Sequence, residues 1–145
     1  MRGGGTPARR DVVPACDDAA VLKYVHQTLQ EPGTVNRVQK VLYDRYQAAM
    51  PMLVWMVTFA QFQEMAKIST IKPLEKVTDQ GYWAGLRKRD CSAYTTFEIH
   101  NDKLTKTMRR DYAPENGDPF GLTVSYTLAG IAGSNRLEIG IERLK

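Results

Sequence analysis

The sequence predicts an α+β fold in which N-terminal helices pack on a C-terminal antiparallel sheet of about four strands. Apolar residues recur every three or four positions in the first part of the chain, whereas from Cys91 onward they largely alternate with polar ones. The chain has 145 residues, of which 43% are hydrophobic and 25% charged, as in one ordinary globular domain. We therefore expect a disordered leader over residues 1–15 and a single α+β domain over residues 16–145.

Three helices are expected in the N-terminal half. Asp17 or Asp18 is suited to cap the first helix, which the Glu31-Pro32-Gly33 segment ends. The second helix continues until Pro51, and the apolar stretch beyond it predicts a third, deeply buried helix over residues 51–67. The apolar stripes are Val21, Leu22, Val25 and Leu29 in the first helix and, from Thr34 onward, Val35, Val38, Val41, Leu42, Tyr46 and Ala49 in the second.

Beyond the helices, the spacing of apolar residues is typical of strands. Residues 69–77 predict an edge strand, because Pro73 cannot donate a ladder hydrogen bond. A half-buried strand over residues 91–99 is followed by a turn at residues 100–102 and by a more polar partner strand containing Leu104, Met108 and Tyr112.

A loop over residues 113–121 then leads into two further alternating segments, which a turn at residues 130–135 separates. Helices covering one face of this sheet would bury the inward positions Thr95, Phe97, Val124, Tyr126, Ile139 and Ile141.

Cys16 and Cys91 are the only cysteines in the chain. One interpretation is a disulfide that joins the start of the first helix to the sheet, which would remove about 4 kcal/mol of unfolded-state entropy. The alternative is two buried, reduced thiols. We favour the disulfide and, with it, an exported protein in the periplasm or the extracellular medium, although residues 1–10 show no apolar segment of a signal peptide.

The order of helices followed by a meander resembles the NTF2-like and cystatin-like folds. The segment from Ile68 to Leu144 also resembles small exported bacterial proteins, in which a cysteine precedes the first helix and a Cys-x-Ala strand is followed by a Tyr-Thr strand. The corresponding residues here are Cys91-Ser92-Ala93 and Tyr126-Thr127. VirB8-like periplasmic domains of type IV secretion systems share the broad architecture. The resemblance implies a location in the cell envelope and no enzyme activity.

The residues that would carry catalysis are sparse, so we expect no enzyme, no cofactor and no metal site. His26 and His100 are the only imidazoles, and neither has an acid nearby at a spacing typical of metal ligands. No apolar stretch reaches the length of a membrane span, and a net charge of +4 is too modest to indicate a nucleic-acid partner.

A protein partner, acidic in character, is the expected ligand. The predicted docking residues combine aromatic and basic side chains near strand edges, where two basic clusters could converge on one edge of the sheet. They are Tyr82, Trp83, Arg87, Lys88, Arg89, Arg109 and Arg110. The expected function is a non-enzymatic interaction or envelope-assembly module.

Two alternatives remain open from the sequence. An inhibitor or immunity protein would plug a partner enzyme with the loop at residues 113–121. A ligand carrier or enzyme would have a pocket beneath the central helix, near Met52, Trp55, Met56 and Phe59.

Overall fold

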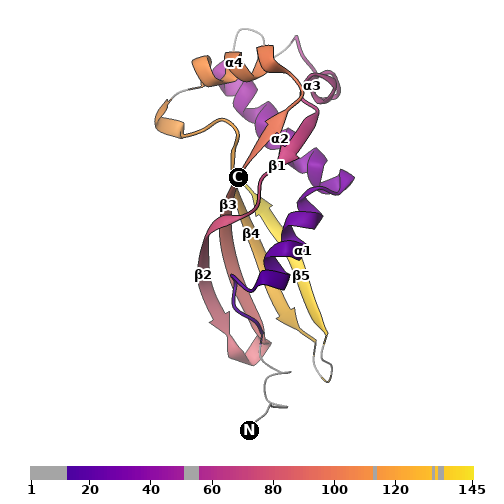
Figure 1. Cartoon of the computed structure of the whole chain (residues 1–145), viewed down its shortest axis with the longest axis vertical. Coiled ribbons are helices and arrows are strands. Elements are labelled where there is room, and N and C mark those ends of the chain that lie inside the picture. The colour runs from indigo at the N-terminus through magenta and orange to yellow at the C-terminus, as the bar shows by residue number, and fades with distance from the viewer. Residues whose placement is uncertain (1–12, 51–55, 113, 132, 134–135) are drawn as a thin grey trace.

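The computed structural model describes residues 13–50, 56–112, 114–131, 133 and 136–145. Helices precede and flank a five-stranded antiparallel sheet in this part of the chain, so the predicted α+β class is confirmed. The helices are α1 (Ala19–Leu29), α2 (Pro32–Ala49), α3 (Phe59–Met65) and α4 (Asp102–Asp111); the strands are β1 (Ile68–Ile71), β2 (Glu75–Trp83), β3 (Lys88–Ile99), β4 (Gly121–Gly130) and β5 (Leu137–Leu144). The molecule is elongated, with α3 and α4 together at one end (Figure 1).

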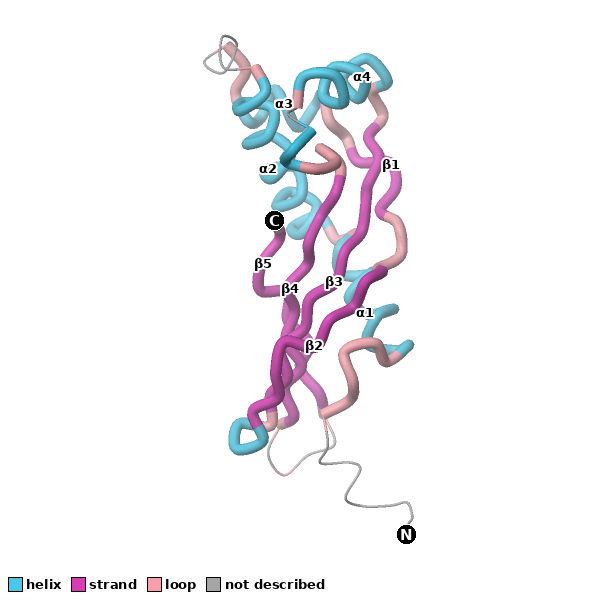
Figure 2. Tube along the Cα trace, turned by 90° about the vertical axis from the view of Figure 1, so that its left-hand side faces the viewer, coloured by secondary structure: helices cyan, strands magenta, loops and turns pink. Residues whose placement is uncertain are grey.

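The sheet is organised around β3. Its strand order is β1-β3-β4-β5, and β2 also pairs with β3. β1 pairs with the C-terminal end of β3 and β2 with the rest of it, so the two short strands follow one another along the same edge. Pro73 lies between them, which agrees with the predicted interruption of an edge strand (Figure 2).

One face of the sheet supplies most of the core. Cys91, Ala93, Thr95 and Phe97 of β3 are buried, and β4 brings Val124 and Tyr126 to the same face. Ile139 and Ile141 of β5 also pack against this core but are only partly buried. The helices cover this face, while the intervening residues of β3 and β4 lie on the opposite, more polar face.

The first helix begins as its sequence predicts, and the second begins earlier than expected. The Asp18 side chain accepts hydrogen bonds from the backbone N–H groups of Ala20 and Val21, which confirms an aspartate cap. α2 begins at Pro32, two residues before the expected Thr34, because proline fits the first turn of a helix, where no backbone donor is needed.

The predicted third helix over residues 51–67 is corrected in length and burial. Residues 51–55 lie outside the described part of the chain, and α3 begins only after Thr58, whose side chain accepts from the Gln61 backbone N–H in a capping box. Phe62 is the one fully buried side chain of α3, and Met56 before it is exposed. α3 is therefore a short surface helix that contributes a single aromatic anchor to the core.

The partner strand expected after residues 100–102 is wrong, because residues 102–111 form α4; residues 100 and 101 connect β3 to this helix. The Asn101 side chain caps the helix by accepting from the Leu104 backbone N–H at 3.0 Å. Leu104, Met108 and Tyr112 are four residues apart, a spacing that places them on one face of a helix, and the first two are buried.

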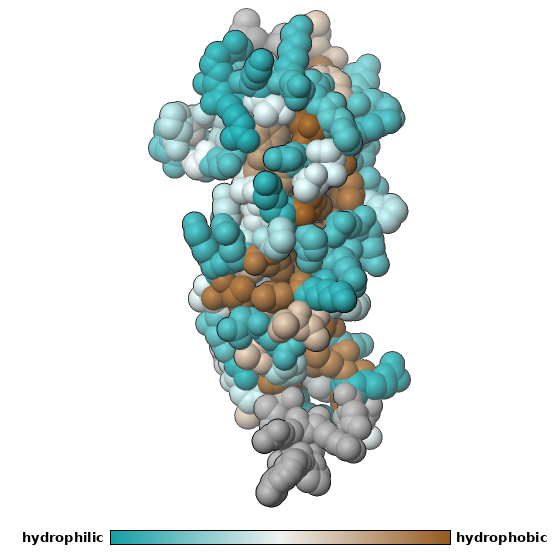
Figure 3. All heavy atoms as spheres, in the orientation of Figure 1, coloured by the Kyte–Doolittle hydropathy of each residue, from teal (hydrophilic) through white to brown (hydrophobic). Residues whose placement is uncertain are grey.

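The chain packs from its first described residue, since Val13 is buried in the core although the leader was expected to extend to residue 15. Among the described residues, no helix is long and apolar enough to cross a bilayer. The face seen in Figure 3 is mostly hydrophilic around α3 and α4, and hydrophobic side chains reach the surface farther along the sheet.

Candidate functional site

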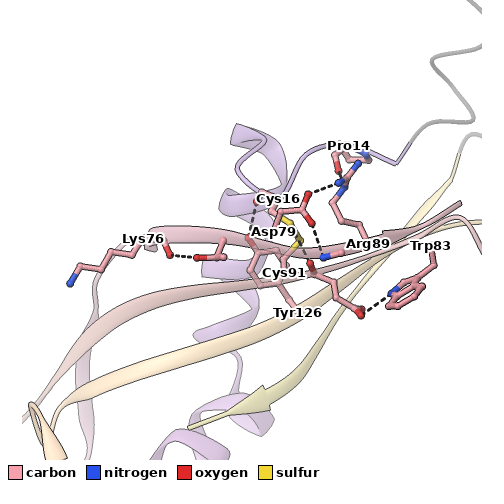
Figure 4. Close-up of a disulfide and its surroundings, with 11 residues drawn as sticks. Pro14, Cys16, Lys76, Asp79, Trp83, Arg89, Cys91 and Tyr126 are labelled. Carbon is pink, nitrogen blue, oxygen red and sulfur yellow. Dashed lines mark hydrogen bonds and ion pairs between the residues drawn. A yellow bond between two sulfur atoms is a disulfide. The ribbon is translucent and has the colours of Figure 1, made fainter.

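Cys16 and Cys91 form a disulfide, as predicted (Figure 4). Their Cα atoms are 5.6 Å apart, and the bond joins the segment before α1 to the middle of the sheet across 75 positions of sequence. Both cysteines are buried. A disulfide of this kind is typical of proteins that fold in an oxidising compartment.

Arg89 holds the same N-terminal segment beside the disulfide. Its guanidinium donates to the Pro14 carbonyl at 3.0 Å and to the Asp79 carboxylate, and it lies 4.7 Å from the centre of the Tyr82 ring. The pKa of Asp79 is lowered, first by a hydrogen bond from the Gly81 backbone N–H and then by Arg89. Arg89 is thus largely engaged within the fold and acts as a clamp on the N-terminal segment.

Tyr126 completes this attachment from inside the core. Its hydroxyl donates to the Cys16 carbonyl at 2.7 Å, and the side chain is almost wholly buried. Burial raises the pKa of Tyr126 to about 12, and the nearby Asp17 carboxylate adds to the rise. The phenol therefore stays neutral and keeps its donor at physiological pH.

The end of β2, the turn after it and the first residue of β3, residues 82–88, form an exposed apolar and basic surface that we call the hairpin tip. Trp83 is 55% exposed, Leu86 73% and Tyr82 39%. These are three of the five large apolar side chains that are exposed in the described part of the chain. The Trp83 indole is nevertheless held in place, because its N–H donates to the Asp90 carboxylate at 3.1 Å (Figure 4).

The backbone of the hairpin tip is fixed by its turn. Ala84–Leu86 form a single 3₁₀ turn that Arg87 ends with a positive φ of 49°. The Arg87 carbonyl accepts from the Gly130 backbone N–H at 2.9 Å, so the neighbouring end of β4 supports the tip. Lys88 lies 3.7 Å from Asp90, an exposed ion pair that leaves the lysine accessible.

Arg109 and Arg110 do not join this surface, so the predicted convergence of the two basic clusters is wrong. They lie on α4, which follows the C-terminal end of β3, whereas the hairpin tip precedes its N-terminal end. A strand of 12 residues spans about 40 Å and separates the two clusters. Arg109 packs over the Phe120 ring near Asp118, and Arg110 pairs with the adjacent Asp111.

The two histidines lie in different surroundings, one within the fold and one at the surface. The His26 ring lies 2.7 Å from the Ile71 carbonyl and joins α1 to β1, and His100 is exposed. Within the described residues, no group of three or more potential ligand side chains could hold a metal ion. Met52 and Trp55 of the proposed pocket beneath the central helix lie outside the described residues.

The second half of the loop at residues 113–121 is anchored to the fold. Ala113 lies outside the described residues. Pro119 and Phe120 are buried, and Arg45 donates to the Pro119 and Gly121 carbonyls at 2.8 and 2.6 Å. Arg45 also lines an open cavity of about 720 Å³. Nothing in the sequence singles out this residue, because one arginine on a helix carries no local signal of a pocket formed by distant segments.

Comparisons with protein-family models, with curated proteins and with solved structures find no match to this chain.

Proposed function

We propose that this protein is an exported, non-enzymatic binding module that captures an acidic protein partner with its hairpin tip, as part of envelope assembly. The observation that carries the proposal is the exposure of Tyr82, Trp83 and Leu86 within the hairpin tip, at the end of the sheet where β2 turns into β3. Tryptophan and tyrosine are enriched among the residues that dominate binding energy in protein interfaces. Tyr82 and Trp83 are consecutive in β2 and project to opposite faces of the strand, so the tip exposes apolar surface on both sides.

The geometry favours a partner that binds a preorganised surface. Trp83 is oriented by Asp90, and the turn beneath Leu86 is fixed by its own hydrogen bonds, so little conformational freedom would be lost on binding. Beside these side chains, Lys88 stays accessible in its exposed ion pair with Asp90. An accessible ammonium group next to apolar side chains suits a partner with an acidic rim around an apolar pocket.

Support for export comes from the disulfide. Bonds of this kind persist outside the reducing cytosol, and the disulfide, the Arg89 clamp and the Tyr126 hydrogen bond attach the same N-terminal segment. The proposed role in the envelope rests on the resemblance, which the sequence alone suggests, to small exported proteins of NTF2-like and cystatin-like type.

Site-specific photocrosslinking in the native host tests the proposal. A photoreactive residue at Leu86 should form a discrete adduct with one protein, whereas the same residue at exposed Lys106 on α4 should not. With that protein purified, Trp83→Ala should weaken its affinity about 30-fold, as expected of a central aromatic contact. Tyr24→Ala removes a similarly exposed aromatic on α1 and should leave the affinity unchanged.

The same variants give outcomes that contradict the proposal. Equal crosslinking at positions 86 and 106, or equal affinities of Trp83→Ala and the unaltered protein, would remove the hairpin tip as the docking surface. Sedimentation with anionic phospholipid vesicles that depends on Trp83 would instead assign the tip to a membrane surface.

A further inference from the structure

The cavity beside Arg45 is a second site of interest, which shares no residue with the hairpin tip and is independent of the proposed function. Its walls come from α2, β3, the segment after α4, and the paired β4 and β5, and it opens to solvent. Its volume of about 720 Å³ is within the range of small-molecule sites. The cavity lining includes Val41, Arg45, Tyr94, Tyr112, Asp118 and Leu144.

Arg45 is held in place by two hydrogen bonds to backbone carbonyls, which engage only one nitrogen of its guanidinium group. Its Nη1 atom donates to the Pro119 and Gly121 carbonyls, and the structure gives Nε and Nη2 no partner among the described residues. Within that part of the chain Arg45 makes no ion pair: the two carboxylates of the cavity wall face other bases, Asp44 facing Lys40 and Asp118 facing Arg109. Burial lowers the pKa of Arg45, which still remains charged at neutral pH.

Two phenols complete the polar side of the cavity. Tyr94 packs so closely over Gly121 that a Cβ atom at that glycine would lie 2.2 Å from its hydroxyl oxygen. Tyr94 and Tyr112 have no hydrogen-bond partner for their hydroxyls within the described residues, so both donors are available to a ligand. Val41 and Leu144 add aliphatic surface, which together with the tyrosine rings can accept an apolar body.

We propose that this cavity binds a small organic monocarboxylate with an apolar or aromatic body. The available Nε and Nη2 edge of a guanidinium offers two parallel N–H donors, which match the two oxygens of a carboxylate. A bound carboxylate would also supply the counter-charge that a partly desolvated Arg45 lacks. Two carboxylates, Asp44 and Asp118, balance the bases Arg45 and Lys145 in the wall, so a singly charged group is favoured over a doubly charged phosphate monoester.

The test uses NMR titration of the ¹⁵N-labelled protein with 3-phenylpropionate, its neutral amide and phenyl phosphate. We expect saturable shifts of the Arg45 Nε–H signal by the carboxylate, with a Kd on the order of 1 mM or tighter for a ligand of this size. The amide should bind at least tenfold more weakly, because a hydrogen bond to a charged group is lost. Phenyl phosphate should not bind more tightly than the carboxylate.

Variants locate the binding in the cavity. Thr123→Trp should abolish saturable binding by filling the space from an exposed position on β4, without touching the Arg45 hydrogen bonds. Arg45→Lys should weaken binding at least tenfold, whereas the matched control Arg110→Lys, at an exposed arginine paired with its neighbour, should have no effect.

Several results would overturn the proposal. They are equal affinity for the acid and the amide, unchanged binding in Thr123→Trp, or tighter binding of phenyl phosphate. If Arg45→Lys fails to fold because the loop is released, Thr123→Trp and the comparison of the acid with its amide still decide the question. None of these variants alters the hairpin tip, so failure here is separate from failure of the proposed protein binding.

Discussion

Replacing both cysteines with alanine, Cys16→Ala with Cys91→Ala, should lower the free energy of unfolding by about 4 kcal/mol. The disulfide closes a loop across 75 positions of sequence, and the chain-entropy model assigns about 4.5 kcal/mol to such a constraint on the unfolded chain. Alanine is the suitable replacement, because both sites are buried and serine would place an unsatisfied hydroxyl there. For a chain of this length, the loss corresponds to a fall in Tm of about 13 °C.

Urea unfolding of the oxidised protein and of the alanine pair measures this difference. The slope of the free energy against urea should be steeper for the variant, because an unfolded chain without the cross-link exposes more surface. Intact mass after alkylation, with and without reductant, establishes the thiol state of each sample. A loss below about 1 kcal/mol with an unchanged slope would refute the reasoning, since the disulfide would then not constrain the unfolded state.

Three further substitutions test individual contacts. Tyr126→Phe should cost about 1 to 2 kcal/mol in urea unfolding, because it leaves the Cys16 carbonyl without its donor. The pKa of Tyr126 is raised from 10.0 to about 12 in the folded protein, so the unfolded chain ionises first as the pH rises. The contribution of Tyr126 to stability is therefore constant below pH 10 and falls between pH 10 and 12. This fall, at most about 2 to 3 kcal/mol, should be absent from Tyr126→Phe, and an identical alkaline slope in both proteins would contradict it. Asn101→Ala should cost about 1 to 2 kcal/mol by removing the cap of α4 and the bond to the Met65 carbonyl; an unchanged urea midpoint would argue against α4. Gly121→Ala should destabilise by about 1 to 3 kcal/mol, and by clearly less when Tyr94 is also replaced by leucine; equal losses in both backgrounds would show that the tyrosine is not the obstacle.

The error at α4 shows where a local pattern was informative but misinterpreted. Apolar residues at positions 104, 108 and 112 are separated by four, and the even spacing is compatible with one face of a strand as well as with a helix. The asparagine at position 101 distinguishes the two, because its side chain caps the first turn of a helix. Asn101 is therefore the residue in the sequence that predicts the helix.

The hairpin tip and the cavity beside Arg45 differ in how much of each can be predicted from the sequence. The aromatic and basic composition of the hairpin tip is visible in the sequence, and the structure adds that Arg89 is largely engaged within the fold while Trp83 and Leu86 are exposed. The cavity beside Arg45 has no sequence signal. Its walls are separated by tens of residues along the chain, and no local pattern specifies which of them meet.

The sequence by itself determined the elements whose cause is local: the aspartate cap of α1, the alternation that assigns one face of β3 and β4 to the core, and the proline that divides the edge of the sheet. Only the tertiary structure decided that Cys16 reaches Cys91, that the two arginine clusters lie at opposite ends of β3, and that Arg45 enters a cavity. The physical reason is that periodicity and capping act over a few residues, whereas these arrangements depend on how the helices and the curved sheet pack on one another.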